Sequence, residues 1–427
     1  LIQSYPTQVE DYPQFYNTLA GGDASVGYTV NPKTGEPYTP QIVPRGDYAR
    51  VLAEFWADGP ESETPPGHWF VILNEVSDHP LSSRRFGGTG PELDLLEWEA
   101  KTYFTLGGAM HDAAISAWGV KGWYDYIRPI SALRAMAAVG QSSEPLLPSF
   151  SPFGIPLQPG YIELVAEGDP LAGSASEHVG KIKLLAWRGP GYIVDPKTDE
   201  AGVGWILAEN WWSYQRPTFV TPPFAGYVSG HSTFSRAAAE VMTALTGDPY
   251  FPGGMSSFEI PRNEFLVFEE GPSVDMTLQW ATYRDASDQC SLSRIWGGIH
   301  PPFDDIPGRL MGMEIGVDAF NYASAMFGNN EPPTVNLTAP VNGASYNWGA
   351  NIELTATASD ADGSVTRVEF YQGSTLVGED SNAPYSFTWL HPDVGDYTLT
   401  AVAIDDTGAS TTSTAVGVSV IINIPGC

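Results

Sequence analysis

Cysteine is nearly absent from this sequence, since 427 residues contain only Cys290 and Cys427. Two thiols are too few for a disulfide framework or for a zinc site built from thiolates. A single bridge between them would satisfy disulfide chemistry, but nothing in the sequence pairs them. We expect two unrelated thiols.

Basic residues are scarce as well. The chain has 20 Lys and Arg against 50 Asp and Glu, which gives a net charge of −30. Phosphate contacts need a basic surface and anionic lipids attract basic segments, so this balance excludes a typical nucleic-acid binder and disfavours membrane docking. The longest apolar stretch, residues 416–424, is interrupted by Gly417, Ser419 and Asn423. A membrane span needs about 18 apolar residues, so we expect none.

Glycine (45) and proline (36) are abundant, and 42% of the residues are hydrophobic. This composition predicts a globular protein with many turns between short elements. The length exceeds what one hydrophobic core supports, so two or three domains are expected. The chain starts at Leu1 rather than Met, and with its acidity this favours a processed product that is secreted or held at the cell surface.

The clearest domain boundary is the segment Gly328-Asn-Asn-Glu-Pro-Pro333. Residues 306–327 before it have helical spacing, whereas the residues after it alternate Thr, Val and Ile between turn signals. About seven short strands in roughly 90 residues are typical of a β-sandwich. Residues 331–427 resemble the immunoglobulin-like modules of secreted bacterial enzymes. The strand predictions are 334–338, 352–358, 365–371, 397–403 and 416–422.

Residues 1–330 read as a mostly α domain. Its first 90 residues are loop-rich, with helices expected near 47–57 and 68–77. Helical patterns then dominate at 91–138, 203–214 and 231–246. No internal repeat is visible.

The first motif with chemical content joins Lys121 and Arg128, which precedes Pro129. Seven residues are nearly two helical turns, so both cations could share one helix face. A guanidinium fork and an ammonium together suit a tetrahedral oxyanion. On its own, the motif also fits a solvated helix face that ends at the proline.

The second motif is Ser229-Gly230-His231, followed by an Ala-rich helical run. A Ser-Gly step at a helix start places backbone N–H groups and the helix dipole against an anion. The serine hydroxyl adds a donor, and His231 can transfer a proton near neutral pH. The alternative is an ordinary capped helix with an incidental histidine.

The third motif contains Arg294, His300 and Asp304. In a His-x-x-x-Asp spacing, the carboxylate can hold one ring nitrogen and leave the other basic. An ion pair at a helix end is the alternative. Cations are scarce in this chain, so three of them in matched motifs favour a common oxyanion site, and no His-x-x-x-His pair or Cys cluster indicates a divalent metal.

In this order, the three motifs resemble those of the vanadium-dependent haloperoxidases and of the related type-2 phosphatidic-acid phosphatases and acid phosphatases. The stretch Ser62-Glu-Thr-Pro-Pro-Gly-His-Trp69 and the absence of spans favour the soluble bacterial haloperoxidases. The resemblance covers roughly residues 45–325 and implies an α-helical bundle with vanadate as cofactor. Val228 departs from it, because many members have proline there.

The resemblance also implies roles for individual residues. His300 would bind vanadium through a ring nitrogen, Asp304 would orient His300, and His231 would act as acid–base residue. The vanadate oxygens would be neutralised by a set of donors: Lys121, Arg128, Arg294, Ser229 and the Gly230 amide. The implied reaction converts halide and hydrogen peroxide into hypohalous acid, which acts on small organic substrates. Phe224 would line the halide pocket.

Two other functions stay open. A phosphomonoesterase could use the same site, with His300 as nucleophile and His231 as acid. Alternatively, the chain is a structural or display protein with a vestigial anion site, in which residues 331–427 serve surface attachment or assembly. By analogy with relatives, we expect a homo-oligomer.

The sandwich offers a candidate calcium site. Asp360 and Asp362 lie in an Asp-x-Asp-Gly turn, and Asp405 lies in a later turn. Carboxylates grouped at one end of a sandwich can bind Ca²⁺. The alternative is that they form Asx-type turns.

Overall fold

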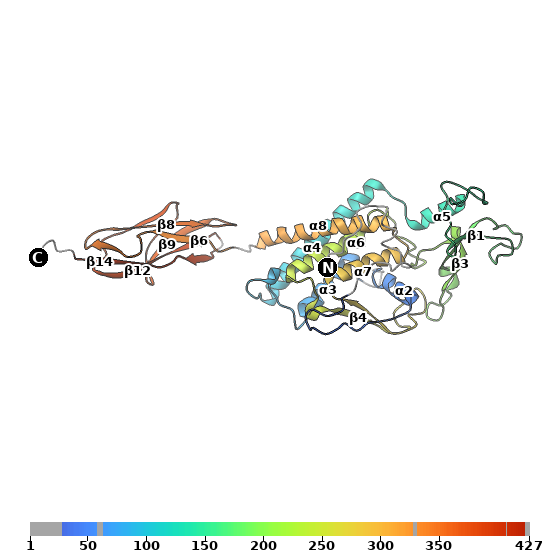
Figure 1. The fold of residues 1–427 in the computed structure, drawn as a ribbon, viewed down its shortest axis with the longest axis horizontal. Helices are drawn as coiled ribbons and strands as arrows, with labels where there is room; N and C mark the ends of the chain where they lie inside the picture. Colours follow the sequence, from blue (N-terminus) through green and yellow to red (C-terminus); the bar gives the residue numbers. More distant parts are fainter. Residues whose placement is uncertain (1–27, 58–62, 328–330, 407, 423–427) are drawn as a thin grey trace. The chain divides into compact units, whose positions relative to one another are not determined.

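The structure, a computed structural model, describes residues 28–57, 63–327, 331–406 and 408–422. The chain divides between Ala323 and Ser324 into two compact units, here called unit 1 and unit 2. Within the described residues, helices make up most of the regular structure of unit 1, and unit 2 is all β after the last helix ends at Phe327 (Figure 1). This confirms the fold class that the sequence predicted.

The described part of the chain contains seven α-helices, and their positions confirm most of the predicted ones. Helical segment 91–138 is two helices, because Asp125 adopts a left-handed conformation and Pro129 starts the next helix. None of these helices has the length and apolar character to cross a membrane. They are α2 (Arg45–Phe55), α3 (Pro65–Asp78), α4 (Leu95–Tyr124), α5 (Pro129–Val139), α6 (Gly230–Thr246), α7 (Tyr283–Trp296) and α8 (Pro302–Phe327).

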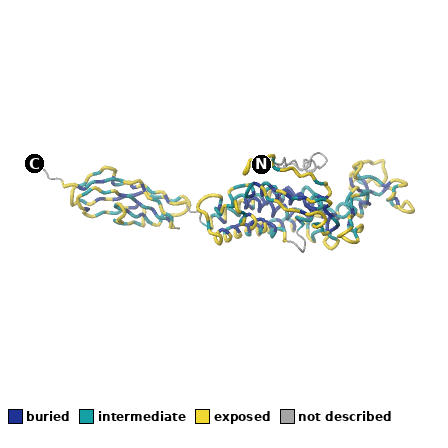
Figure 2. Tube along the Cα trace, turned by 90° about the horizontal axis from the view of Figure 1, so that it is seen from below, coloured by how far each residue is buried: buried dark blue, intermediate teal, exposed yellow. Residues whose placement is uncertain are grey.

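Helix α6 forms the centre of unit 1. It is buried along most of its length, and it packs against α3, α4 and α7. Figure 2 shows that the buried segments of the helical unit gather in its interior. Ser229 caps its first turn, where the Ser229 hydroxyl oxygen accepts a hydrogen bond from the Ser232 amide. Gly247 ends the helix in a left-handed conformation, which glycine adopts at little cost.

Helix α8 lies close against α6 because three of its glycines, four residues apart, face that helix. A Cβ on any of them would lie 2.4 to 2.8 Å from a backbone carbonyl oxygen of α6 or of its cap residue. The contact also includes a hydrogen bond from the Ser229 amide to the Asp304 carbonyl, 2.8 Å long. The start of α8 is therefore fixed beside the start of α6. The three glycines are Gly308, Gly312 and Gly316.

Buried ions join α6, α7 and α8. Arg309 of α8 donates to both carboxylate oxygens of Asp305, at 2.9 and 2.8 Å, and to Asp288 of α7 at 2.8 Å. Asp305 also accepts a 2.6 Å hydrogen bond from the Ser232 hydroxyl of α6. A buried carboxylate is tolerated only when it is paired in this way, so the network fixes the relative positions of the three helices.

Between α5 and α6, the chain forms an antiparallel three-stranded sheet of β1 (Ile162–Leu164), β2 (Ile182–Trp187) and β3 (Val203–Leu207). The predicted helix at 203–214 is therefore wrong, since this segment is β3 followed by a 3-10 turn at Ala208–Asn210. A short apolar run is compatible with either a strand or a helix. This run is a strand because it pairs with β2. A hairpin of β4 (Ser256–Ile260) and β5 (Met276–Trp280) completes the β structure of unit 1.

Unit 2 is a sandwich whose described residues form nine strands rather than about seven. One sheet has the order β10-β9-β12-β14-β7 with β13 beside β12, and the other has the order β11-β8-β6. The five predicted strands coincide with β6, β8, β9, β12 and β14. Bounds are β6 (Thr334–Ala339), β7 (Ala344–Asn347), β8 (Ile352–Ser359), β9 (Val365–Gln372), β10 (Thr375–Asp380), β11 (Tyr385–Trp389), β12 (Gly395–Asp405), β13 (Ser410–Thr412) and β14 (Val416–Ile421).

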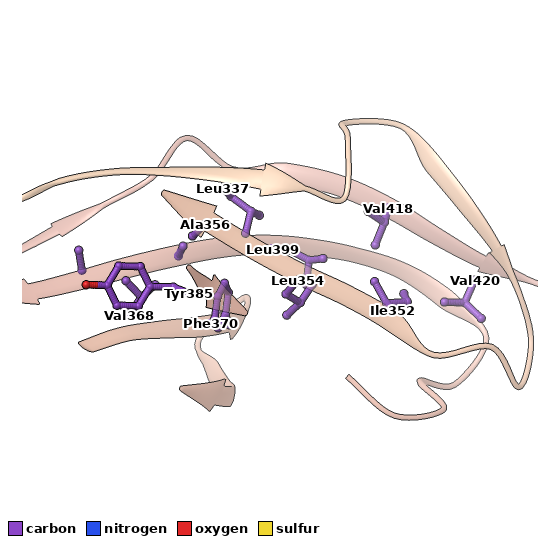
Figure 3. Close-up of a cluster of buried hydrophobic side chains, with 12 residues drawn as sticks. Leu337, Ile352, Leu354, Ala356, Val368, Phe370, Tyr385, Leu399, Val418 and Val420 are labelled. Carbon is purple, nitrogen blue, oxygen red and sulfur yellow. The ribbon is translucent and has the colours of Figure 1, made fainter. Parts of the chain in front are cut away.

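The sandwich core consists of alternate side chains from the two sheets. Leu354 of β8, Phe370 of β9 and Leu399 of β12 are almost completely buried and meet between the sheets (Figure 3). This alternation of buried and exposed positions is the period-two pattern of a half-buried strand, and it is the pattern from which the strands were predicted.

The contact between α6 and α8 can be tested with Gly312→Ala, whose Cβ would lie 2.4 Å from the Thr233 carbonyl oxygen. Because the helices must separate, we expect the free energy of unfolding of unit 1 to fall by about 1–3 kcal/mol in urea unfolding. Gly108→Ala in α4 is the matched control, since its Cβ would meet nothing within 4 Å. Equal midpoints for Gly312→Ala and the unsubstituted protein would rule out this close contact.

Candidate functional site

Lys121 lies in the last turn of α4 and is only 2% exposed. Its ammonium donates hydrogen bonds to the carbonyl oxygens of Ala225 at 3.0 Å and Gly226 at 2.8 Å. Burial, and after it the charge of Arg128, lowers the pKa of Lys121 to about 7. A neighbouring anion would stabilise the charged form of such a buried ammonium.

Arg128 does not share a helix face with Lys121, so that prediction is wrong. It stands before α5 as its extended cap residue, because α4 ends at Tyr124. Both cations nevertheless reach the same segment: Arg128 donates to the carbonyl oxygens of Phe224 at 3.0 Å and Ala225 at 3.2 Å. The two cations are brought together by the loop that precedes α6 and not by a shared helix.

His300 and Asp304 form the pair that the sequence spacing predicted. His300 Nδ1 lies 2.6 Å from Asp304 Oδ2, and both residues are buried. His300 Nε2 lies 3.0 Å from Nη1 of Arg128, which can only donate. A neutral ring carries one hydrogen, so that hydrogen is on Nδ1 and the lone pair is on Nε2.

Burial lowers the pKa of His300 well below its usual value, and the charges of Arg128, Lys121, Arg294 and His231 lower it further. The imidazole is therefore neutral at pH 7, and its neighbours include the cations of the first and third sequence motifs. Burial raises the pKa of Asp304 to about 7, although Lys121 and Arg128 oppose this rise.

Ser229, Gly230 and His231 open α6 as expected, with Ser229 fully buried. The Ser229 hydroxyl lies 2.9 Å from that of Ser232. Arg294, in the last turn of α7, is 1% exposed and donates from Nη1 to the carbonyl oxygen of Trp56.

Two aromatic rings cover the cations. Phe224, 39% exposed, has its ring centre 5.4 Å from the Lys121 ammonium and 5.3 Å from the Arg128 guanidinium. The Trp118 ring centre lies 5.0 Å from that of Phe224, and a Cβ on Gly230 would come within 3.1 Å of the Trp118 ring. Trp118 was not among the site residues predicted from the sequence, although its position one helical turn before Lys121 places it on the same helix face.

The Asp residues of unit 2 give the calcium expectation no support. Asp360 Oδ1 accepts the amides of Asp362 and Gly363, both at 3.2 Å, and Asp405 Oδ1 accepts the Ala409 amide at 2.9 Å. The bonds of Asp360 are those of an Asx turn, whereas the bond of Asp405 closes a longer turn of four residues. Across the described residues of both units, no three His, Cys, Asp or Glu side chains gather as metal ligands. Cys290 is buried beside Ser235, whereas Cys427 lies outside the described residues.

The donor set of unit 1 fits a tetrahedral oxyanion such as vanadate. The Lys121 ammonium has three hydrogens, of which two bind the carbonyl oxygens of the loop before α6. The neutral His300 ring has a nitrogen lone pair that lies among cations. Such a nitrogen can bind the high-valent central atom of an oxyanion.

Family models match both units. The model described as the VCPO second helical-bundle domain matches residues 101–329, which are 229 of the 427 residues, and a bacterial Ig domain model matches residues 333–401. The chain belongs to the vanadium chloroperoxidase family. No curated protein matches it.

Solved structures of the family include a holo-type bacterial vanadium-dependent chloroperoxidase, with 18% identity, a TM-score of 0.43, and coverage of 65% of this chain and 44% of that chain. A bacterial vanadium-dependent iodoperoxidase has 20% identity, a TM-score of 0.35 and coverage of 65% and 44%. This chain thus spans less than half the length of either. Fibronectin(III)-like modules of Clostridium thermocellum CbhA have 34% identity over 21% of this chain and 99% of theirs, with a TM-score of 0.21.

Oxyanion affinity should fall as pH rises through about 7, because Lys121 loses its positive charge there and Asp304 gains a negative one. Sulfate is a suitable probe, since its own charge is constant in this range. Calorimetric titrations from about pH 6 to about pH 9 should show the association constant falling, with each of the two groups contributing up to about tenfold per pH unit. Lys121→Gln should bind more weakly at low pH and show a shallower slope. A flat profile in the unsubstituted protein would exclude titration of this pair.

Proposed function

We propose that this protein is a vanadate-dependent haloperoxidase that oxidises halide with hydrogen peroxide to hypohalous acid. Family membership supports the class of reaction. The observation that carries the proposal is the neutral His300 ring, which has its Nε2 lone pair among three buried cations and its Nδ1 hydrogen bonded to Asp304. Such a nitrogen is a ligand for a high-valent oxyanion rather than a general base exposed to water.

In this proposal, His300 Nε2 would hold the vanadium, and Arg128, whose Nη1 lies 3.0 Å from that nitrogen, would neutralise a vanadate oxygen. Lys121 and Arg294 would neutralise further oxygens, with the Ser229 hydroxyl and the Gly230 amide as neutral donors. Bound vanadate supplies Lewis acidity toward peroxide without a change of metal oxidation state. The buried cations stabilise the negative charge in surroundings of low polarity, where such interactions are strong.

His231, in the first turn of α6, is the residue that we assign to proton transfer. A histidine there is partly buried and can take a proton from peroxide and later return one. Phe224 and Trp118 limit access of water to the cations, and we assign Phe224 to the halide pocket. Hypohalous acid then reacts with small organic substrates.

Unit 2 supports an extracellular setting, since the matching model is a bacterial Ig domain. We propose that it attaches the enzyme to a surface or partner outside the cell, while unit 1 carries out the chemistry. Homo-oligomer formation remains a prediction.

His300→Ala tests the assignment of the vanadium ligand. It removes the nitrogen lone pair, so we expect vanadium binding, measured by elemental analysis after equilibration with vanadate and desalting, to fall to background. The exposed His111→Ala, whose side chain is 72% exposed, is the control and should bind normally. A His300→Ala protein with full vanadium content and an unchanged melting temperature would remove His300 from the site.

His231→Ala separates proton transfer from cofactor binding. We expect it to keep its vanadium but to lose peroxide-dependent bromination by about 10²–10⁴-fold, as is typical for loss of a general acid–base group. If the variant brominates at the rate of the unsubstituted protein, His231 has no part in the proton transfer.

A further inference from the structure

Two tyrosines lie in the short segment between the cations of the first motif. Tyr124 is the last residue of α4, one helical turn after Lys121, and is 61% exposed. Tyr126 lies two residues before Arg128 and is 43% exposed. Two phenol rings that solvent reaches therefore stand beside the oxyanion site.

Backbone contacts place Tyr126 next to the charged groups of the site. The Tyr126 carbonyl oxygen accepts the Gly226 amide at 2.9 Å, and the Gly226 carbonyl oxygen accepts the Lys121 ammonium at 2.8 Å. A Cβ on Gly226 would lie 3.7 Å from the Tyr126 carbonyl oxygen and 3.1 Å from Asp304 Oδ2. Tyr126 and two charged groups of the site thus approach the same residue, Gly226.

Aromatic neighbours hold both phenol rings in place. The Tyr126 ring centre lies 5.2 Å from that of Phe303, which directly precedes the carboxylate residue of the site. The Tyr124 ring centre lies 5.2 Å from that of Tyr227, in the loop before α6. Both pairs have the edge-to-face geometry that aromatic rings prefer. The two phenols are therefore packed against the segments that carry the site.

We propose that Tyr124 and Tyr126 are sites of covalent modification, at which hypohalous acid formed at the oxyanion site halogenates the rings of the enzyme itself. The proposal rests on the proposed function, which supplies the oxidant. A ring carbon next to the one that bears the hydroxyl donates an electron pair to the halogen, so a carbon–halogen bond forms as the oxygen–halogen bond breaks. The ring proton and the departing hydroxide form water, and the product is a 3-halotyrosine. No further oxidant or reductant takes part.

Tyr322 is the matched comparison, because it is 68% exposed but distant from the site. It follows Asp304 in the same long helix, α8, and lies about 27 Å further along the helix axis (Figure 1). The concentration of a molecule released at one point falls with distance from that point. Oxidant that leaves the site therefore reaches Tyr124 and Tyr126 at a higher concentration than it reaches Tyr322.

The first measurement treats the full-length protein without vanadate with added hypobromous acid and locates bromine by tandem mass spectrometry of its peptides. The three exposed tyrosines should all be brominated, whereas the buried Tyr283 should not. This treatment gives the reactivity of each ring toward oxidant from bulk solution, independently of any activity of the protein. The inference is overturned if neither Tyr124 nor Tyr126 takes up bromine.

The second measurement lets the vanadate-loaded protein form the oxidant from bromide and hydrogen peroxide. Excess free methionine, whose thioether is readily oxidised, removes the oxidant that has diffused away. The bromine content of each tyrosine is divided by its content after the bulk treatment. We expect this ratio to be at least about threefold higher for Tyr124 and Tyr126 than for Tyr322, which is several times farther from the site.

The double variant Tyr124→Phe with Tyr126→Phe keeps both ring contacts but removes the hydroxyl groups that activate the rings. It should lose bromine at these two positions and keep the labelling of Tyr322. Equal ratios at the three tyrosines, or no bromine at Tyr124 and Tyr126, in a protein that brominates a diketone probe would overturn the inference and leave the haloperoxidase proposal intact. A protein that brominates neither the probe nor its own tyrosines overturns the proposed function, and this inference with it.

Discussion

The hydrogen bond between His300 Nδ1 and Asp304 Oδ2 is the interaction on which the candidate site depends. It is 2.6 Å long and buried, and it fixes the ring hydrogen on Nδ1 so that Nε2 keeps its lone pair. The carboxylate also offsets the buried charges of Lys121 and Arg128. The glycines of α8 allow its first turn to approach Ser229, so the same close packing of α6 and α8 positions the histidine and the oxyanion donors together.

Much of the site could be predicted because its signals are local in sequence. Asp304 follows His300 by four residues, and Ser229 directly precedes the helix that it caps. Such short spacings fix the relative positions of the side chains largely independently of tertiary structure. The sandwich was predictable for a similar reason, since alternation of side chains along β8, β9 and β12 specifies which face is buried.

The features that could not be predicted from the sequence depend on contacts between distant segments. Lys121 and Arg128 look like neighbours on one helix, but Pro129 starts a new helix and the carbonyl oxygens of the loop at 224–226 join the two cations. Segment 203–207 is a strand because β2 lies beside it. No local pattern reveals that partner. The buried pairs of Arg309 with Asp305 and Asp288 are likewise visible only after three helices have packed.

Three buried cations lie beside a neutral histidine in this acidic chain. We propose that they bind an anion and that this anion is vanadate used with peroxide. The most direct measurement is bromination of a diketone probe by the purified protein with bromide and hydrogen peroxide, before and after removal of vanadate and after its return, beside hydrolysis of a phosphomonoester by the vanadate-free protein. The account predicts bromination that disappears and returns with vanadate, and no comparable hydrolysis. Efficient hydrolysis without bromination under any vanadate condition would contradict it.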